Sequence, residues 1–501
     1  MEMGSLRLTE QYDLTTVPGM VECILDLLKI NQRLSEQLTS TNRRLYGQSS
    51  EKSVYDGRTL LDEIEGGRAW LDSQGRAPDD QVPEPPQVAE PESRSARRPR
   101  SKREDLLPED LEIRPVEHKL PEEELICPEC GRKRKVIGHD TTDQIVVVPA
   151  HAYIRRHIRE VCVCGHCNNT GESAHVQKAG MPRPPVPGSF AAPETLAWVI
   201  DQKYNLGLPL YRIEQSLAGQ GIRISRQTLS GWMMASADLL EPVYDALHAR
   251  LIAGDIIMLD DTPLQVLREP DKPAKSKSYA WVYRTDRFAP MQIILYDYQA
   301  RHTMDGVKAF LQGFSGWLQG DGFPGYDQLP PEMRHVACLA HIRRKFHDAR
   351  LNLPEDRRSG SLAQQGLNWC LALYAIEKGI RDLSPEHRKA VRLEKTLPIL
   401  DDFEVWLREE AKYIGKTKTG DAIRCALGQF GNLRRCLEDG RLAIDNNLTE
   451  ATGIKPFVMG RKAWLFSNTP RGAKASAILY SMVQTAKANG LIPPDFWVIL
   501  Y

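Results

Sequence analysis

The 501-residue sequence has no apolar run that approaches the roughly 20 residues a transmembrane helix needs. Its first residues, MEMGSLRLTEQYD, lack the basic and then apolar layout of a signal peptide. Net charge is also absent, because 66 basic residues balance 66 acidic ones, so no global field attracts nucleic acid. In a chain of several domains, however, a basic face can be balanced by an acidic segment elsewhere. The missing transmembrane run and signal peptide predict a cytoplasmic protein with no membrane partner. Several domains are expected, since the length exceeds what one hydrophobic core usually serves.

Disulfide bonds are rare in the cytoplasm, so the uneven placement of the ten cysteines indicates a metal site instead. Cys127-x2-Cys130 and Cys164-x2-Cys167 flank a run of strand-forming residues. Two such pairs fit a tetrahedral thiolate zinc site on two knuckle turns. Cys162 leaves the second pair ambiguous, although the two-residue gap favours Cys164. We predict a zinc ribbon over residues 120–178 that needs structural Zn²⁺ to fold.

The amino-terminal part has a heptad pattern followed by a segment without any apolar face. Residues 18–48 are expected to form a helix or coiled coil, in which Asn31 at a seam position favours a dimer. A single amphipathic helix packed on its own protein is the alternative. Residues 73–108 are rich in Pro, Glu, Arg and Ser and read as a disordered linker. Its basic stretch SRSARRPRSKR either contacts phosphate or is a solvated tail.

Residues 190–250 are predicted to be helical. Within them RIEQSLAGQGIRISRQTLSGWM resembles a helix–turn–helix, with Ser225 as the N-cap of a second helix that begins with Arg226, Gln227 and Thr228. A plain pair of antiparallel helices fits the same residues equally well, because only contacts to bases would separate the two interpretations.

From residue 252 the pattern changes to strands. DIIML, SYAWVYR and PMQIILYDY predict three successive strands, HTMDGVKAFLQGF a helix, and GWLQGDGFPGYDQL a fourth strand. HVACLAHIRRKFHDA opens a long helical stretch, with an insertion at about 350–440, and GAKASAILYSMVQTAKANG predicts a last helix. This is the layout of a ribonuclease H-like α/β core over residues 252–485, followed by a tail at 486–501.

Carboxylates end two of these strands. Asp260 and Asp261 close the first strand and Asp321 closes the fourth. In a ribonuclease H-like sheet those two strands are neighbours, so Asp260 and Asp321 would lie side by side, and Glu450 from a later helix could complete the site. Three hard oxygen ligands suit Mg²⁺ or Mn²⁺, and two such ions about 3.5–4 Å apart serve phosphoryl transfer. Considered alone, each aspartate is explained equally well as a residue that stabilises a turn.

The motifs LDDTPLQVL, GDGFPGYDQL, CLAHIRRKF, IDNNLTE and GRKAWLFSNTPRGAKASAILYSMVQTAKANG resemble the insertion-sequence transposases of the IS sixty-six group. The similarity extends to LYGQSSEK and to the cysteine ribbon. It implies a metal-dependent DDE transposase that cuts the ends of its own element, joins them to target DNA and works near the nucleoid with companion proteins of that element. By the match, Asp260, Asp321 and Glu450 are the catalytic carboxylates, whereas Asp261 stands where relatives often have Glu.

The resemblance gives the basic clusters a role as phosphate contacts that hold DNA in register without reading its sequence. The expected contacts are Arg343, Arg344, Lys345, Arg461, Lys462, Arg471 and Lys474. Cys338 and His341 form a C-x2-H pair, for which a packed cysteine and a hydrogen-bonded histidine are favoured over a second zinc site.

One departure from the family lies just after Glu450. Relatives continue as E-x-A-I-R-P, whereas this chain reads EATGIKP, one residue longer and containing Gly453. One extra residue rotates the rest of a helix by about 100°, so either a bulge absorbs it or Gly453 breaks the helix. Two alternatives to an active transposase therefore stay open: an impaired copy that binds element ends as a regulator, and a structure-specific endonuclease that cuts without joining.

Overall fold

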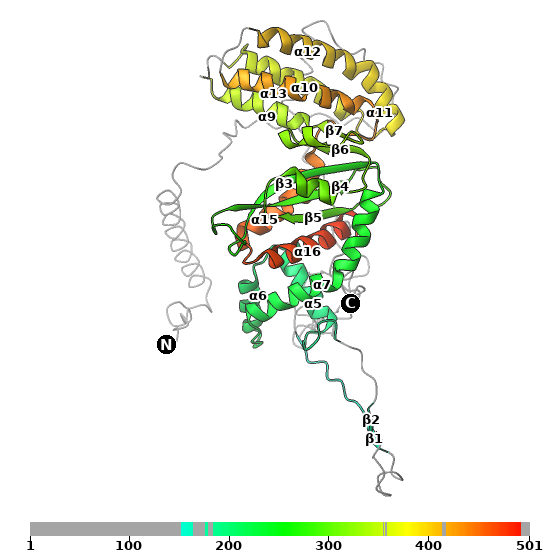
Figure 1. Cartoon of the computed structure of the whole chain (residues 1–501), viewed down its shortest axis with the longest axis vertical. Helices are drawn as coiled ribbons and strands as arrows, with labels where there is room; N and C mark the ends of the chain where they lie inside the picture. The colour runs from blue at the N-terminus through cyan, green and yellow to red at the C-terminus, as the bar shows by residue number, and fades with distance from the viewer. Residues whose placement is uncertain are drawn as a thin grey trace, which may run out of the picture. The chain divides into compact units, whose positions relative to one another are not determined.

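The computed structural model describes residues 152–163, 176–178 and 184–491, apart from 354, 356–357 and 413–416 (Figure 1). The predicted amino-terminal helix, the linker and Cys127, Cys130, Cys164 and Cys167 lie outside these residues. Cys162 lies in β1 (Val161–Val163), which pairs antiparallel with β2 (Val176–Lys178), and its side chain is exposed. The helices in the described part of the chain are all too short or too polar to cross a bilayer.

The chain divides into two compact units. One is a helical unit formed by residues 339–440, and the other contains the sheet and includes residues up to 338 together with those from 441 onward. The two units are described separately.

A five-stranded mixed sheet forms the centre of the second unit. Its order is β5-β4-β3-β6-β7, in which β3, β4 and β5 run antiparallel and β3, β6 and β7 run parallel. The strands are β3 (Ile256–Gln265), β4 (Lys277–Thr285), β5 (Ile294–Gln299), β6 (Gly316–Gly320) and β7 (Met333–Ala337). The helix α8 (Met304–Phe310) connects β5 to β6. The three predicted successive strands, the helix and the pairing of the first strand with the fourth are confirmed.

Two details of the predicted core were wrong. The first strand was expected to end at Asp260 and Asp261, but β3 continues to Gln265. The fourth strand does end beside Asp321, and the short 3₁₀ helix η4 (Pro324–Gln328) follows it. The expected helix at 335 is in fact β7, and helix α9 (Leu339–Leu351) begins only after it. A run of three or four apolar residues does not distinguish a buried strand from a buried helix, and pairing of Gln319 with Val336 decides for the strand.

Side chains alternate between the two faces of the sheet, as the period of a strand requires. On β4, Trp281 and Tyr283 join one cluster with α8, whereas Ala280 and Val282 join the other cluster with the carboxyl-terminal helix α16 (Pro470–Ala488). The sheet is therefore buried on both faces.

Helix α16 also protects the edge of the sheet, where it lies along β5 (Figure 1). Ser481 Oγ accepts a hydrogen bond from Tyr296 N–H at 2.7 Å, and Thr485 Oγ1 accepts one from Ile294 N–H at 3.0 Å. Thr485 returns a bond to the carbonyl oxygen of Ile294 at 3.0 Å. Hydroxyl groups thus take the place of a sixth strand, which satisfies backbone groups that an edge would leave open.

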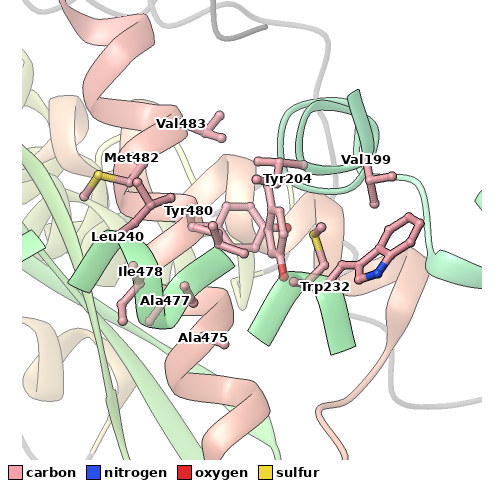
Figure 2. Close-up of a cluster of buried hydrophobic side chains, with 14 of the residues drawn as sticks. Val199, Tyr204, Trp232, Leu240, Ala475, Ala477, Ile478, Tyr480, Met482 and Val483 are labelled. Atoms are coloured by element: carbon pink, nitrogen blue, oxygen red, sulfur yellow. The ribbon is translucent and has the colours of Figure 1, made fainter. Parts of the chain in front are cut away.

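The predicted helical segment before the sheet contains α5 (Pro193–Ile200), the π-helix η3 (Asp201–Asn205), α6 (Leu210–Gly219) and α7 (Arg226–Ile252). Ser225 caps α7 as predicted, because its hydroxyl accepts from Thr228 N–H at 3.1 Å. Tyr204, Trp232 and Leu240 from this segment pack with Tyr480 of α16 in one buried cluster (Figure 2). The rings of Tyr204 and Tyr480 meet edge to face at 5.0 Å. These helices therefore share a core with the sheet.

The helical unit is built from five α-helices and two short irregular turns among its described residues. After α9 they are α10 (Leu362–Gly379), α11 (Pro385–Val391), η6 (Arg392–Thr396), α12 (Leu397–Ala411), α13 (Lys418–Arg434) and η7 (Arg435–Leu437). Glu377 receives hydrogen bonds from Arg392 at 2.7 and 2.8 Å and lies 3.4 Å from Arg388. Arg392 is fully buried, so this paired network fixes α10 against η6.

The chain returns to the sheet through α14 (Asn447–Thr449), the π-helix η8 (Glu450–Ile454) and α15 (Lys455–Trp464). These three segments follow each other without a break. Lys455 N–H donates to the carbonyl oxygen of Glu450, five residues back, where an α-helix would reach only four. Of the two outcomes expected for the extra residue, the bulge is confirmed, and Gly453 does not break the helix.

Helix α15 ends in a strained turn. Leu465 has φ 66° and ψ −51°, and Phe466 N–H donates to the carbonyl oxygen of Trp464 at 2.9 Å. This is a γ-turn with a positive φ at its centre, a rare conformation. For a residue with a side chain, such backbone strain costs on the order of 1–3 kcal/mol.

Candidate functional site

The sheet register places two of the predicted carboxylates level with each other. Met258 of β3 pairs with Gln319 of β6 in the parallel ladder, and Asp260 and Asp321 each follow two residues later. Parallel strands keep their spacing along the chain, so Asp260, which lies within β3, is level with Asp321, which directly follows β6. The sequence-based expectation that they lie side by side is met by this register.

Asp260 lies in a crowded acidic environment. Burial raises the pKa of its carboxyl group to about 7, and repulsion from Asp321, Asp261 and Glu450 adds to the shift. The N–H of Asp261, which donates to Asp260 Oδ1 at 2.8 Å, counteracts it in part. Asp321, Asp261 and Glu450 therefore all lie within electrostatic range of Asp260.

Two contacts hold Asp321, one at its side chain and one at its backbone. Its Oδ1 accepts from Phe323 N–H at 3.0 Å, which ends β6 in a tight turn. Nε2 of the buried His335 lies 3.1 Å from the carbonyl oxygen of Asp321. Both contacts fix where the side chain leaves the strand.

Glu450 comes from a segment that is clasped to β3 just upstream of it. Asn446, only 2% exposed, donates from Nδ2 to the carbonyl oxygen of Leu259 at 2.8 Å and accepts from Thr449 Oγ1 at 2.7 Å. Leu259 is the residue before Asp260. Asn446 therefore ties the start of the glutamate-bearing helix to the strand that carries the first aspartate.

A second contact reinforces this connection from β6. Gln319, two residues before Asp321, is 1% exposed and donates from Nε2 to the carbonyl oxygens of Ala443 and Asp445. Its Oε1 accepts from Ala443 N–H at 3.2 Å. Cys338 contributes as well, since its Sγ accepts from Asn446 N–H at 3.1 Å. Cys338 is thus a packed cysteine, as favoured from the sequence.

The π-turn that begins at Glu450 is fitted closely to the sheet. A Cβ on Gly453 would lie 2.5 Å from Val282 Cγ1 of β4, so only glycine fits there without movement. The hydroxyl of Tyr296 donates to the carbonyl oxygen of Gly453 at 2.6 Å. This carbonyl oxygen of the π-turn therefore has a hydrogen-bond partner in the sheet.

The acidic side chains converge without forming a closed metal cage. Among the residues that the structure describes, no three His, Cys, Asp or Glu side chains stand close enough together to hold a metal ion. Without a cation, carboxylates at one site repel each other, and the raised pKa of Asp260 reflects that repulsion in addition to burial. The donor set itself, all carboxylate oxygen, is the kind that Mg²⁺ and Mn²⁺ prefer.

His302 is a site residue that the sequence analysis missed. Its Nε2 lies 2.9 Å from Asp261 Oδ1, and its ring stacks on Tyr279 at 4.3 Å and packs against Phe323 at 4.4 Å. Burial raises the pKa of Asp261, and the hydrogen bond from His302 opposes that rise. A lone histidine in the connection after β5 carries no motif that would have revealed it.

The predicted phosphate-binding residues are in different settings. Arg461 donates to Thr262 Oγ1 at 3.1 Å, beside Asp261, and burial lowers its pKa. Lys462 is exposed on α15. Arg471 and Lys474 of α16 are instead paired with Asp238 and Glu241 of α7 at 2.8 and 2.6 Å, respectively. Residues 343–345 lie on α9 in the helical unit.

Asp260 lies on β3, Asp321 directly follows the neighbouring parallel strand β6, and the segment that carries Glu450 is tied to β3. This arrangement is compatible with a DDE-type polynucleotidyl transferase. Comparison with known families agrees. Residues 188–475, more than half of the chain, match the family model described as "Transposase IS66 family". Residues 124–168 match the "zinc-finger binding domain of transposase IS66". The chain therefore belongs to the IS66 family of transposases, and its activity is DNA transposition.

Relatives in Sinorhizobium fredii (strain NBRC 101917 / NGR234) extend the similarity beyond the catalytic part. Uncharacterized protein y4qI is 30% identical over 398 residues, which cover 75% of this chain and 70% of the relative. Uncharacterized protein y4hP is 28% identical over 484 residues, 93% of this chain and 84% of the relative. The zinc-finger domain and the DDE domain predicted from the sequence are thus both confirmed at the level of the family.

Proposed function

We propose that Asp260, Asp321 and Glu450 are the catalytic carboxylates with which this transposase cuts the ends of its element and joins them to target DNA. The observation that carries the proposal is the acidic cluster around Asp260, whose carboxyl pKa is raised to about 7 by burial and by repulsion from Asp321 and Glu450 among its neighbours. A cluster of like charges around a half-buried carboxylate is costly unless a cation or substrate uses it.

The same three residues would hold Mg²⁺ or Mn²⁺. The all-carboxylate donor set fits these hard cations, and the partial exposure of Asp260 and Asp321 and the exposure of Glu450 leave room for phosphate oxygens. When bound, two such ions stabilise both the attacking and the leaving oxygen at phosphorus. A sheet of this order, with one carboxylate on β3 and another directly after β6, supports assigning the core to the ribonuclease H-like class.

Three side chains of the protein position the carboxylates and the DNA backbone. Asn446 fixes the helix of Glu450 to β3, and His302 orients Asp261 beside the first aspartate. Arg461, bonded to Thr262 on the same strand, is placed to bind a backbone phosphate close to the reaction. No protein nucleophile is needed, because the attacking hydroxyl belongs to water during cleavage and to a DNA 3′ end during joining.

The remaining parts receive supporting roles in this proposal. Cys127, Cys130, Cys164 and Cys167 hold structural Zn²⁺ in the family's zinc-finger domain, and that domain contributes to recognition of the element ends. The heptads of residues 18–48 join two copies, since an end-to-end DNA complex needs at least two. The pair α6–α7, with Ser225 as a formed N-cap, offers Arg226 and Gln227 for DNA contact.

A cleavage and strand-transfer assay tests the assignment. Purified protein is incubated with a labelled duplex that carries the element's own end and with Mg²⁺ or Mn²⁺. We expect cleaved and joined products for the parent chain and for Asp327→Ala, a matched control on the exposed side of η4, and none for Asp321→Ala. Products from Asp321→Ala at the parent level would refute the assignment.

The same assay separates the alternatives. Cleavage without joined products would favour a structure-specific endonuclease, and specific binding without metal-dependent cleavage would favour an end-binding regulator. The extra residue after Glu450, which motivated the regulator, is absorbed by a π-turn, and the carbonyl oxygen of Gly453 within that turn accepts a hydrogen bond from Tyr296. That observation supports the active transposase.

A further inference from the structure

The strained turn after α15 exposes two large apolar side chains. Leu465 is 63% exposed and Phe466 is 43% exposed, although both follow a helix whose last residue, Trp464, is well anchored. A turn that only had to reverse the chain would use Gly or Asn, which adopt a positive φ without strain. Leu465 holds that conformation while contributing little to the core.

The neighbouring structure enforces the turn from both sides. Trp464 Nε1 donates to the hydroxyl of Tyr480 at 3.3 Å on the helix side. On the other side Ser467 joins the end of β3, since its N–H donates to the carbonyl oxygen of Gln265 at 2.9 Å and its own carbonyl oxygen accepts from Leu267 N–H at 3.0 Å. Strain of this kind persists only where the surroundings over-determine it, and such positions cluster at ligand-binding sites.

Two continuous elements connect this turn to the catalytic carboxylates. From Glu450, fifteen helical residues lead to Leu465, which is roughly 22 Å at 1.5 Å per residue. From Asp260, five residues of β3 lead to Gln265, the partner of Ser467, which is roughly 17 Å at 3.3 Å per residue. The turn is therefore rigidly placed at about 17–22 Å from the acidic cluster, which corresponds to five or six base steps of 3.4 Å.

The face of α15 between the two sites suits a DNA backbone. Lys455, Met459 and Lys462 are spaced four and three residues apart, so they share one face of the helix, and all three are exposed. Neither lysine forms an ion pair with any acidic side chain in the described part of the chain. Unpaired ammonium groups along the path from Glu450 to Phe466 favour a polyanion over a protein partner.

We propose that Leu465 and Phe466 form an apolar wedge that stacks on a base of the element-end DNA, five or six nucleotides from the phosphate that is cut. The proposal rests on the assignment of the catalytic carboxylates made above. Apolar and aromatic side chains inserted between base steps unstack them and kink the duplex. A pinned, strained turn suits that task because it loses no conformational freedom on binding.

A fluorescence scan tests the position of the wedge. End duplexes carry 2-aminopurine, which brightens when it is unstacked, at each of the ten positions next to the cut, and are mixed with Asp321→Ala protein, so that binding is read without chemistry. We expect one bright position at nucleotide five or six, a signal lost with Phe466→Ala and retained with Phe190→Ala, a matched control for an exposed phenylalanine. No bright position in the scan would overturn the proposal.

A rescue experiment separates a wedge from a merely structural residue. Stacking of one base is worth about 1–3 kcal/mol, so Phe466→Ala should lower strand transfer on normal DNA about tenfold. On DNA with an abasic site at the bright position, where unstacking is no longer needed, the variant should come within twofold of the parent. Loss of activity without rescue, or a change in the oligomeric state of Phe466→Ala without DNA, would overturn the proposal in favour of a folding or protein-contact role. If the parent makes no joined product at all, the fluorescence scan still decides on the wedge.

Discussion

Replacing Gly453 by alanine probes how tightly the glutamate-bearing helix is fitted to the sheet. The added Cβ would lie 2.5 Å from Cγ1 of Val282, a side chain that is fully buried on β4. Real Cβ atoms do not approach a neighbour so closely, so either the π-turn or β4 must move. Movement of the turn would also stretch the 2.6 Å hydrogen bond from the hydroxyl of Tyr296 to the carbonyl oxygen of Gly453.

The magnitude follows from opposing effects. Overpacking of a filled core costs about 1–3 kcal/mol. Loss of the tyrosine bond adds about 1 kcal/mol, whereas alanine in place of glycine in a helix gains back about 1 kcal/mol. We expect Gly453→Ala to lower the free energy of unfolding by about 1–3 kcal/mol. Because Glu450 opens the same π-turn, strand transfer should fall by more than the loss of folded protein explains.

Urea unfolding of Gly453→Ala, Val282→Ala and the double variant measures this contact. In the double variant the missing methyl groups of Val282 leave room for the new Cβ, so the combined loss should be at least 1 kcal/mol smaller than the two single losses added together. Purely additive losses would show that the Cβ and Val282 do not collide. In that case the reasoning that the extra residue is accommodated by close fit to β4 is wrong.

Three further predictions concern residues around the carboxylates. Asn446→Ala removes the side-chain partner of the buried Leu259 carbonyl oxygen and of the Thr449 hydroxyl, so the free energy of unfolding in urea should fall by about 2–4 kcal/mol. An unchanged free energy of unfolding would show that Asn446 does not hold the glutamate-bearing segment to β3. His302→Ala should raise the Mn²⁺ concentration needed for half-maximal strand transfer about tenfold, because support of Asp261 is lost, and an unaltered metal titration would contradict this. Without added divalent metal, the pKa of Asp260 is about 7 in the folded protein and 3.8 in the unfolded chain. The contribution of this group to the free energy of unfolding is therefore complete below pH 3.8 and is lost as the pH rises through 7. The difference is at most about 4 kcal/mol, and the unfolding free energy measured at pH 5 and pH 8 should depend less on pH in Asp260→Asn than in the parent.

The catalytic sheet could be predicted because its sequence patterns are local and strong. Each antiparallel strand is a run rich in apolar residues bounded by turn residues, and the aspartates stand where two of these runs end. Once Asp260 and Asp321 are each placed after an apolar run, a parallel pairing of those runs brings them level, as the register of Met258 with Gln319 does. The cap at Ser225 was predictable for the same reason, because it joins residues only three positions apart, Ser225 and Thr228. The continuation of β3 from Asp260 to Gln265 was not predicted, because it depends on pairing with β4.

The features that escaped prediction depend on partners far away in the chain. β7 is a strand because Val336 pairs with Gln319, not because its five residues prefer that conformation. His302 becomes a site residue only through Asp261, 41 positions upstream. Arg471 was expected to face DNA, but α7 passes close enough for Asp238 to pair with it. Hydrophobic periodicity and residue propensity describe neighbours in the sequence, so they give no information about these long-range contacts.

The extra residue after Glu450 illustrates how such distant contacts fix a local conformation. Upstream, Asn446 is bound to Leu259 of β3, and downstream Gly460 allows Tyr480 to approach α15 so closely that a Cβ there would lie 2.1 Å from its hydroxyl. With both ends held, the number of residues between them cannot change without a change in helical winding. The hydrogen bond that spans five residues, from Lys455 N–H to the carbonyl oxygen of Glu450, takes up the additional residue, and the helix continues on either side. In a comparison of motifs alone, the extra residue after Glu450 would indicate an impaired site. It is nevertheless compatible with the proposed position of Glu450, because the sheet and α16 determine where the helix begins and ends.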